Sequence, residues 1–396
     1  MDNAAANQDL PFIPFMRPEI GEPEIESVCE VLRSGWLTTG KWVQRFEQAF
    51  AKYVGAKHAI AVNSATSGLH LGLDALGIGP GDKVLTTPYT FTATGEVIRY
   101  QGADPVFVDI DPRTLNIDVG QMAEALQNVP GIKAMIPVHM AGQACRMKEI
   151  LALSEQYGVP ILEDAAHALP ASTLGRRVGT IGDITAFSFY VTKTITTGEG
   201  GMVTTDDDAY AKRMKTMRLH GIDRDVFSRY TTRKPSWYYE VVAPGYKYNL
   251  TDIAAAIGVH QLAKCDRMAN DRRALAVRYN EAFVDLPVEL PQVENPEDEH
   301  AWHLYILHLK LDALRISRDT FIEKLSERNI GASVHFIPLH FHPYWQESCG
   351  LNEASFPQAT AAFSRVVSLP LYPGMSEEEF QRVITAVREI LLENLA

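Results

Sequence analysis

The sequence predicts an α/β protein with a mostly parallel central sheet covered by helices on both faces, followed by a smaller C-terminal α+β domain. Apolar strand-like runs alternate with helical patterns between residues 58 and 206, which is typical of such a sheet. A long helical pattern then covers residues 251–283, and shorter mixed segments follow it. We therefore predict an N-terminal arm at residues 1–20, a large domain at 21–264 and a small domain at 265–396.

The large domain is predicted to begin with two helices. Helical spacing of apolar residues marks 22–35 and 41–55, and each pattern ends at a glycine, the residue that most easily closes a helix. Strand-like runs and helical patterns then alternate along the chain. We expect strands at 58–64, 83–88, 104–110, 133–140, 159–165, 184–189 and 200–206, and helices at 64–78, 92–102, 145–158 and 208–221.

The predicted small domain has a different arrangement. Residues 303–310 and 333–336 are strand-like, 317–330 are helical, and 376–395 form a final amphipathic helical pattern. No internal repeat or low-complexity segment interrupts the chain. We expect this domain to follow the long helix directly.

Composition excludes several classes of function. The net charge is −12, from 37 Lys and Arg against 49 Asp and Glu, and no long basic run is present, which argues against nucleic acid as a partner. No apolar run approaches the roughly 20 residues that span a bilayer, so we expect no membrane segment. The four scattered cysteines suit neither a zinc site nor a disulfide framework, and we expect a cytoplasmic protein.

Residues 187–201, FSFYVTKTITTGEGG, place a lysine, Lys193, close to several glycines. This suggests a phosphate-binding loop, but the nucleoside triphosphate motif needs glycine directly before the lysine, where Thr192 stands. The stretch GIGPGD at 77–82 fails as a dinucleotide fingerprint because Asp82 occupies the third glycine position. Both nucleotide motifs are therefore poor matches.

A different set of residues is coherent. Asp164 ends a predicted strand, His167 follows it, and Lys193 comes after the next strand, so all should meet at one crevice beyond the strand ends. The stretch NSATSG at 63–68 joins a strand to a helix, which makes an anion site, and Ser188 adds a hydroxyl. A lysine amine, a carboxylate for a pyridine nitrogen and a phosphate-binding helix start are the parts that a pyridoxal 5'-phosphate (PLP) site needs.

These motifs resemble those of the DegT/DnrJ/EryC1/StrS family of sugar aminotransferases, which are fold-type I PLP enzymes. The similarity is carried by NSATSGLHLGLDALGIGPGDKVLTTPYTFTAT, EDAAHA, GDITAFSFYVTKTITTGEGGMVTTDD, RLHGI, PGYKYNLTDIAAAIG, HAWHLYILHLK, VHFIPLH and SLPLYP, and so extends over nearly the whole chain. It looks closest to the branch that aminates C4 of nucleotide-linked keto sugars, such as the UDP-4-keto-pentose aminotransferase. The resemblance implies PLP as cofactor, a nucleotide-linked keto sugar as substrate and L-glutamate as amino donor.

The resemblance also implies roles for individual residues. Lys193 matches the lysine that bonds covalently to the cofactor and acts in catalysis, and Asp164 matches the partner of the pyridine nitrogen. His167 matches a catalytic residue near the ring. The remaining matches are Tyr89, stacked on the ring, and Ala65, Thr66 and Ser188, which contact the phosphate.

One further match concerns the assembly. Asn249, in GYKYNLTD, matches an asparagine that reaches the phosphate from the neighbouring subunit. This implies a homodimer with shared active sites. We expect substrate contacts from Thr38, His335, Arg218 and His220. Five late histidines lack the spacing and the acidic or thiol partners of a metal site, so we expect no metal; they are His300, His303, His335, His340 and His342.

Alternatives remain open at this point. Asp164 could instead cap a helix, and His167 and Tyr89 could be ordinary core residues. The enzyme could aminate C3 rather than C4. It could be one of the PLP-dependent sugar dehydratases, although these carry histidine in place of the lysine, and Lys193 counts against them. A regulatory protein that keeps the fold without catalysis is the last alternative.

Overall fold

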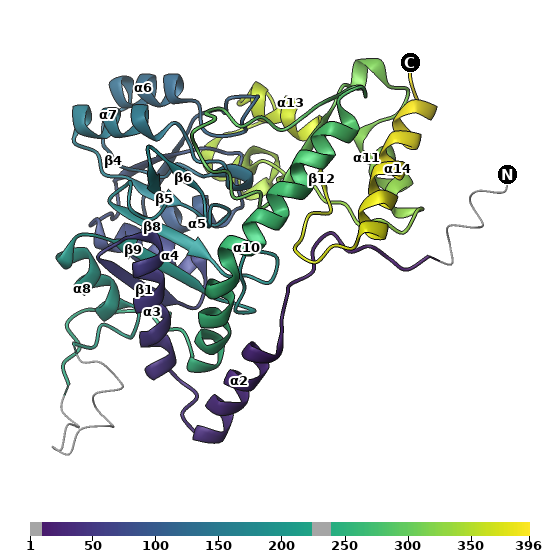
Figure 1. Ribbon diagram of the computed structural model, residues 1–396. Helices are drawn as coiled ribbons and strands as arrows, with labels where there is room; N and C mark the ends of the chain where they lie inside the picture. Colours follow the sequence, from purple (N-terminus) through teal and green to yellow (C-terminus); the bar gives the residue numbers. More distant parts are fainter. Residues whose placement is uncertain (1–9, 224–238) are drawn as a thin grey trace.

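The central sheet is built from strands that match the predicted ones. The computed structural model describes residues 10–223 and 239–396 (Figure 1). Two sheets, of order β3-β2-β4 and β5-β8-β9-β1, are joined by parallel bridges from Met135 to Ile161 and from Val138 to Asp164. Among these strands, β9 runs against the others, so the sheet is mostly parallel as predicted. The strands are β1 His58–Val62, β2 Lys83–Thr86, β3 Asp104–Phe107, β4 Ile132–Met135, β5 Leu162–Asp164, β8 Ile184–Ser188 and β9 Gly201–Thr205.

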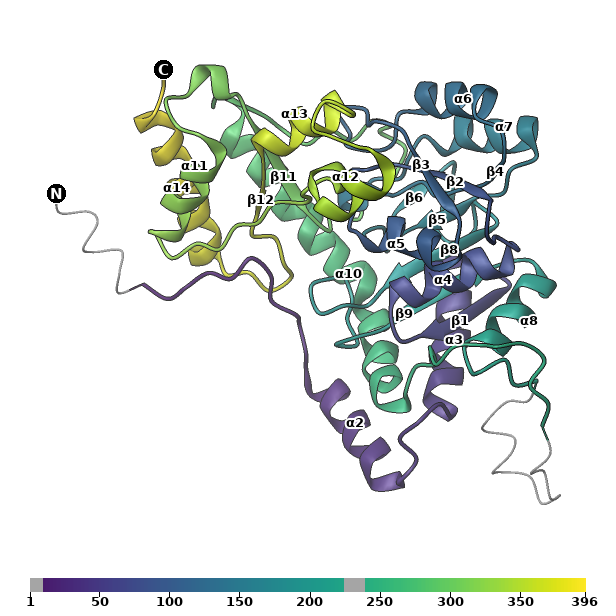
Figure 2. The same ribbon diagram turned by 180° about the vertical axis from the view of Figure 1, so that it is seen from behind.

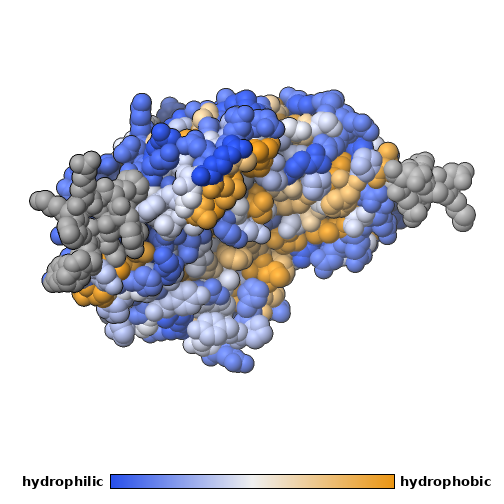
Figure 3. Space-filling view, turned by 90° about the horizontal axis from the view of Figure 1, so that it is seen from below, coloured by the Kyte–Doolittle hydropathy of each residue, from blue (hydrophilic) through white to orange (hydrophobic). Residues whose placement is uncertain are grey.

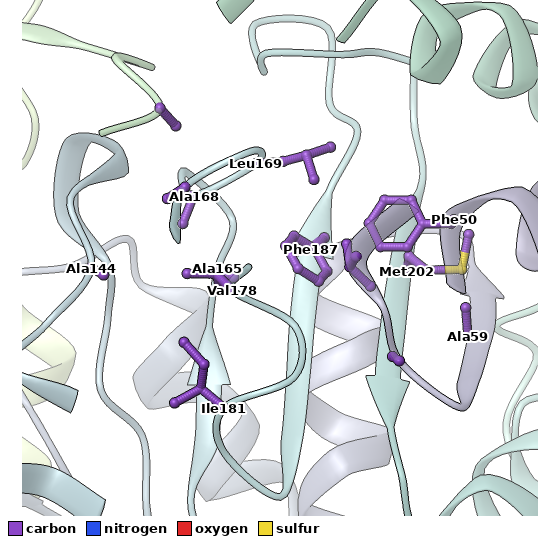
Figure 4. Packing of buried hydrophobic residues seen from close by; sticks show 14 of the residues in the cluster. Phe50, Ala59, Ala144, Ala165, Ala168, Leu169, Val178, Ile181, Phe187 and Met202 are labelled. Carbon is purple, nitrogen blue, oxygen red and sulfur yellow. The ribbon is translucent and has the colours of Figure 1, made fainter. Parts of the chain in front are cut away.

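Helices cover both faces of this sheet. Alternate strand residues point to opposite sides: Ile60 and Val62 join one apolar cluster, whereas Ala59 and Ala61 join another. The first cluster includes α4 Ala65–Ala75, α5 Ala93–Tyr100 and α8 Asp208–Met217. The second includes α2 Glu22–Ser34, α3 Lys41–Val54, α6 Val119–Asn128, α7 Met147–Tyr157 and part of α10 Asp252–Phe283. Figure 4 shows Phe187 and Met202, from neighbouring strands, beside Phe50 of α3 in the second cluster.

The helix ends follow from local sequence. Gly35 and Gly55 close α2 and α3 with left-handed backbone (φ 72° and 90°), which glycine adopts without a Cβ penalty. Ser64 begins α4 by accepting a hydrogen bond from the backbone N–H of Ser67 (3.1 Å). The predicted helix limits in this part of the chain are therefore confirmed to within a few residues.

The small domain packs on an antiparallel sheet of order β10-β11-β12. One prediction here is wrong: residues 333–336 form no strand. Only Ser333 pairs with Ser368, and the chain then leaves the sheet to line a cavity. The elements are β10 Val288–Glu289, β11 Tyr305–Leu309, β12 Val366–Leu369, α11 Arg318–Ser326, α12 Pro343–Cys349, α13 Pro357–Arg365 and α14 Glu377–Glu393. A short hairpin, β6 Ser172–Thr173 and β7 Arg176–Arg177, lies in the large part.

Helix α10 crosses the predicted domain boundary without a break. Cys265 and Met268 belong to the large apolar cluster, whereas Ala276 and Tyr279 belong to the cluster under α11 and α14. The division at residue 264 stays a prediction. The N-terminal arm leaves α2 and runs to the small domain (Figures 1 and 2), where Ile13 is buried in the same cluster as Ala276. Within the described residues, no helix is both long enough and apolar enough to cross a membrane.

Candidate active site

A cavity of about 590 Å³ opens at the carboxyl ends of β5 and β8, beside the first turn of α4. Ligands of open α/β sheets bind at this edge because the chain leaves each strand there. The cavity brings together most of the residues predicted from sequence: Ala65, Thr66, Asp164, His167, Ser188, Lys193 and His335. Residues from the arm and the small domain, including Phe15 and Phe336, form the opposite wall.

Lys193 lies in the loop between β8 and β9. Its backbone N–H donates to the carbonyl of Tyr190 (2.9 Å), which closes a turn. Burial lowers the pKa of the Lys193 amine to about 8, while the carboxylate of Asp164 acts in the opposite direction. The amine is therefore neutral at a much lower pH than that of a free lysine, which suits a nucleophile or a base.

The glycines behind Lys193 serve the backbone. Gly198 adopts left-handed backbone (φ 80°). A Cβ on Gly201 would lie 2.7 Å from both the carbonyl oxygen of Phe187 and the carbonyl carbon of Ser64. The missing side chain therefore lets β9 pack against the start of α4, as a tight chain reversal after the lysine loop requires.

Asp164 is buried at the end of β5, with 6% of its surface exposed. Thr94 donates its hydroxyl to Oδ2 (2.8 Å), and the backbone N–H of Ala166 donates to Oδ1 (3.1 Å). Burial raises the pKa of this carboxyl, and the two hydrogen bonds oppose that shift. The carboxylate is thus held in one orientation in a site where a cationic partner would stabilise it.

Two histidines line the cavity with their rings fixed by neighbours. The backbone N–H of Ala141 donates to Nδ1 of His167 (3.3 Å), so Nδ1 carries no proton and the neutral ring carries it on Nε2. Burial, and the charge of Lys193, hold the pKa of His167 well below its usual value. His335 bonds to the hydroxyl of Ser368 through Nδ1 (2.9 Å), and burial lowers its pKa to about 3. Both rings are therefore neutral at physiological pH.

Tyr89 does not line the cavity, which corrects the prediction that it stacks on a cofactor ring. Its side chain is fully buried in an apolar cluster, and its hydroxyl donates to the carbonyl of His335 (2.9 Å). Phe91, two residues later, lines the cavity instead and has 59% of its surface exposed. Phe91 belongs to the same TPYTF stretch as Tyr89. Residues 88–91 form an irregular turn, so no local pattern shows which of the two rings points into the cavity.

Asn249 lies outside the cavity of its own chain. It pairs with Val62, and its side-chain amide donates to Oγ1 of Thr39 (2.8 Å). Together with Arg218 it lines a second cavity of about 320 Å³. The structure therefore leaves Asn249 without access to this chain's Lys193, and its role at a phosphate stays a prediction about a partner subunit.

The remaining substrate candidates are also outside the cavity. Arg218 forms an ion pair with Glu47 (2.5 Å) and donates to the carbonyl of Ala61 (2.8 Å), and His220 is exposed. Thr38 is exposed in the bend that precedes α3. Arg218 and His220 do not line the cavity of this chain, and Arg218 instead lies beside Asn249 in the second cavity. What these three residues bind stays a prediction.

The comparisons with known proteins agree with this geometry. Residues 18–388 match the DegT/DnrJ/EryC1/StrS aminotransferase family. The chain belongs to this family. The spore coat polysaccharide biosynthesis protein SpsC of Bacillus subtilis is 49% identical over 381 residues, covering 96% of this chain and 97% of SpsC. An uncharacterized protein of Methanocaldococcus jannaschii, MJ1066, is 50% identical over 383 residues, covering 97% and 98%.

Solved aminotransferase structures have the same fold. The sugar aminotransferase Spr1654 of Streptococcus pneumoniae, in its pyridoxamine-phosphate form, is 31% identical with a TM-score of 0.89 and covers 96% of this chain and 99% of its own. PseC of Helicobacter pylori, an aminotransferase of pseudoaminic acid biosynthesis, is 29% identical with a TM-score of 0.88 and covers 97% and 100%. The fold-type I prediction is confirmed.

The protein is therefore a PLP-dependent sugar aminotransferase of the DegT/DnrJ/EryC1/StrS family. The cavity fits this cofactor on its own chemistry: it contains a lysine with a lowered pKa, a buried carboxyl group with a raised pKa, and the first turn of a helix. In the described ranges, 10–223 and 239–396, no group of three or more His, Cys, Asp or Glu side chains could hold a metal ion.

Proposed function

We propose that this protein transfers an amino group from L-glutamate to the C4 ketone of a nucleotide-linked keto-deoxy sugar. The observation that carries the proposal is a lysine with a pKa of about 8 in one cavity with a buried carboxylate and the first turn of α4. Two relatives support a sugar substrate, since SpsC is named for polysaccharide biosynthesis and PseC for pseudoaminic acid biosynthesis. The choice of C4, of a nucleotide and of glutamate follows from the motif resemblance.

Residues of the large domain would hold the cofactor. Lys193 bonds it covalently, and Asp164 pairs with its pyridine nitrogen. The backbone N–H groups of Ala65 and Thr66 and the hydroxyl of Ser188 receive its phosphate, because the first N–H groups of a helix lack internal partners and attract anions. Bound PLP supplies an electron sink for the carbon that loses its proton.

Lys193 also has the properties of the base. Once the donor amine displaces Lys193 from the cofactor, the neutral Lys193 amine can take the proton from the donor carbon and return that proton to the C4′ carbon of the cofactor. Its pKa of about 8 makes both protonation states accessible near neutral pH. Nε2 of His167 is a hydrogen-bond donor, because Ala141 occupies Nδ1. We place this N–H next to the ring of the cofactor, with Phe91 as the stacking residue in place of Tyr89.

We further propose a homodimer with shared sites that works in the cytoplasm. Exposed aromatic side chains stand at the mouth of the cavity, namely Phe91 (59%) and Tyr190 (45%), and Figure 3 shows apolar residues gathered in a band across one face. Contiguous exposed apolar surface is typical of a subunit contact. Asn249 does not line the cavity of its own chain, but in a dimer it would reach the cavity of the other subunit. The four cysteines are free thiols, as a reducing compartment would keep them.

A substrate panel tests the reaction. Purified enzyme with PLP and L-glutamate is given nucleotide-linked 4-keto and 3-keto sugars, and the products are examined by NMR. We expect a new C–N bond at C4 of a 4-keto-deoxy sugar and 2-oxoglutarate as the co-product. Amination at C3 alone, or no amination of any nucleotide-linked sugar, would refute the proposal.

Mixing two inactive variants tests the shared site. In a mixed dimer of Lys193→Ala and Asn249→Ala chains, one site would combine the intact Lys193 of one chain with the intact Asn249 of the other. We expect activity of up to about half that of the wild type in such dimers. If Asn249 served its own chain, mixing would give no activity above that of Asn249→Ala alone.

A further inference from the structure

We propose that the N-terminal arm forms one wall of the substrate site. Phe15 of this arm packs against the edge of the keto sugar that lacks a hydroxyl group, and so favours a deoxy sugar. The inference rests on the proposed sugar substrate. Phe15 lines the same cavity as Lys193 and Asp164, although it lies at the other end of the chain from the small-domain residues beside it. None of the site residues predicted from the sequence lies in this arm.

Backbone hydrogen bonds hold the arm against the small domain. The N–H of Ile13 donates to the carbonyl of Asn329 (2.8 Å), and the N–H of Gly331 donates to the carbonyl of Ile13 (2.8 Å). The side chain of Ile13 is buried, with 1% exposed, and Arg382 donates to the carbonyl of Pro11 (2.9 Å). This section of the arm is therefore part of the folded small domain.

The arm lies so close to the small domain at residue 331 that this residue must be a glycine. A Cβ on Gly331 would lie 2.9 Å from the backbone nitrogen of Phe15 and 3.2 Å from the carbonyl oxygen of Ile13. Beyond Phe15 the arm is anchored again, because Gln261 and Lys264 of α10 donate to the carbonyl of Glu19 (2.7 and 3.0 Å). Phe15 is thus held between two anchors and has little freedom to leave the cavity.

The ring of Phe15 stacks on the ring of His335, with centroids 5.4 Å apart and planes 28° apart. His335 is itself fixed by its bond to Ser368 (2.9 Å) and by Tyr89, which donates to its carbonyl (2.9 Å). Phe336 adds another ring to this wall. The polar groups described for PLP come from the strand ends, whereas this wall presents mainly aromatic carbon.

Such a wall distinguishes carbon from oxygen on a substrate. A sugar hydroxyl pressed against Phe15 would lose its water without gaining a hydrogen bond, whereas a methyl group there would bury apolar surface. An apolar pocket discriminates against an added hydroxyl by about a hundredfold at most. Phe15 therefore favours a 6-deoxy sugar over its 6-hydroxy counterpart, without any part in proton transfer.

Two nucleotide-linked substrates test the assignment, a 4-keto-6-deoxyhexose and the corresponding 4-ketohexose with its 6-hydroxyl. We expect wild-type enzyme to prefer the first by about tenfold to a hundredfold in kcat/KM. Phe15→Ala should raise the KM for the deoxy sugar and remove most of the preference. Phe15→Tyr keeps the stacked ring but offers a hydroxyl, so it should lower the preference with less effect on KM.

Two controls separate a structural effect from selection. Phe12→Ala removes an exposed aromatic side chain (58% exposed) from the same arm and should leave both sugars unaffected. The half-reaction with L-glutamate, followed by cofactor absorbance, should be unchanged in all three variants. The inference is overturned if Phe15→Ala keeps the wild-type preference. If wild-type enzyme takes the amino group from glutamate but converts no keto sugar, the proposed function fails and this inference fails with it.

Discussion

The two walls of the active-site cavity are built differently. On the strand-end wall, polar groups are held by hydrogen bonds from neighbouring elements, as Asp164 is by Thr94 and Ala166. On the opposite wall, the arm and the small domain contribute mainly rings that touch one another, such as Phe15 on His335 and His335 on Phe336. Hydrogen bonds fix direction, whereas stacked rings fix shape and exclude water.

This difference separates the chemistry from the selection of substrate. A change on the strand-end wall should alter the half-reaction with glutamate and the reaction with the sugar alike, because both use the same cofactor. A change on the aromatic wall should act on the sugar alone. The following experiments test that separation.

Removal of the lysine should have the largest effect. Lys193→Ala loses both the covalent bond to PLP and the base, and we expect turnover to fall by about 10⁴-fold or more with either substrate. Absorbance assays of both half-reactions measure this loss. Lys193→Arg, which keeps the charge but not the reactive amine, should be equally inactive; an active arginine variant would show that charge is the property that matters.

Replacement of the carboxylate should come next. Asp164→Asn keeps the size and the hydrogen bond from the Ala166 N–H, and its amide NH2 would donate to the Thr94 hydroxyl instead of accepting from it, but the variant removes the charge that would pair with the pyridine nitrogen. We expect kcat to fall by about 10²- to 10³-fold in both half-reactions. Thr94→Val, which removes only one supporting hydrogen bond, is the matched variant and should cost much less. An equal loss in both variants would contradict a role for the charge.

The pH dependence of cofactor capture tests the state of Lys193. Only the neutral Lys193 amine attacks PLP. In cofactor-free enzyme, the rate of PLP capture should therefore rise about tenfold per pH unit below the pKa of Lys193. The rate should level off above about pH 8, whereas an ordinary lysine would level off above pH 10.5. Stopped-flow absorbance between pH 6 and 10 measures the midpoint. Since Asp164 raises the pKa of Lys193, Asp164→Asn should move the midpoint to lower pH; an unmoved midpoint would show that the two groups do not interact.

The smallest expected effect lies on the aromatic wall. Gly331→Ala would push a methyl group against the backbone of Phe15, and overpacking of this kind costs about 1–3 kcal/mol. We expect a lower Tm and a several-fold higher KM for the sugar, with the glutamate half-reaction unchanged. Gly350→Ala provides a comparison, because a Cβ there meets no neighbour and the penalty is limited to its left-handed backbone (φ 67°). A sugar KM that stays at the wild-type value in Gly331→Ala would contradict the proposed link between arm and site.

The sequence is most informative about the strand-end wall. Asp164, Lys193 and the start of α4 were placed together because parallel strands end at one edge of the sheet, a rule that needs no knowledge of packing. The prediction for Tyr89 is wrong, because the turn at residues 88–91 has no regular period and the choice between Tyr89 and Phe91 depends on which ring the small domain covers. The role of Asn249 at a site on another chain stays a prediction.

Several elements, among them α6, α12, α13 and β12, were not predicted from the sequence. The sequence by itself determined the strands of the central sheet, most of the helices that cover it with their glycine and serine ends, and the polar groups at the strand ends. These features depend on neighbouring residues, whose periodicity and hydrogen bonding can be read along the chain. Tertiary structure alone decided that Ile13 pairs with Ile330 and that Phe15 faces His335. Such contacts join opposite ends of the chain through packing, and no local pattern encodes which distant surface a short arm will cover.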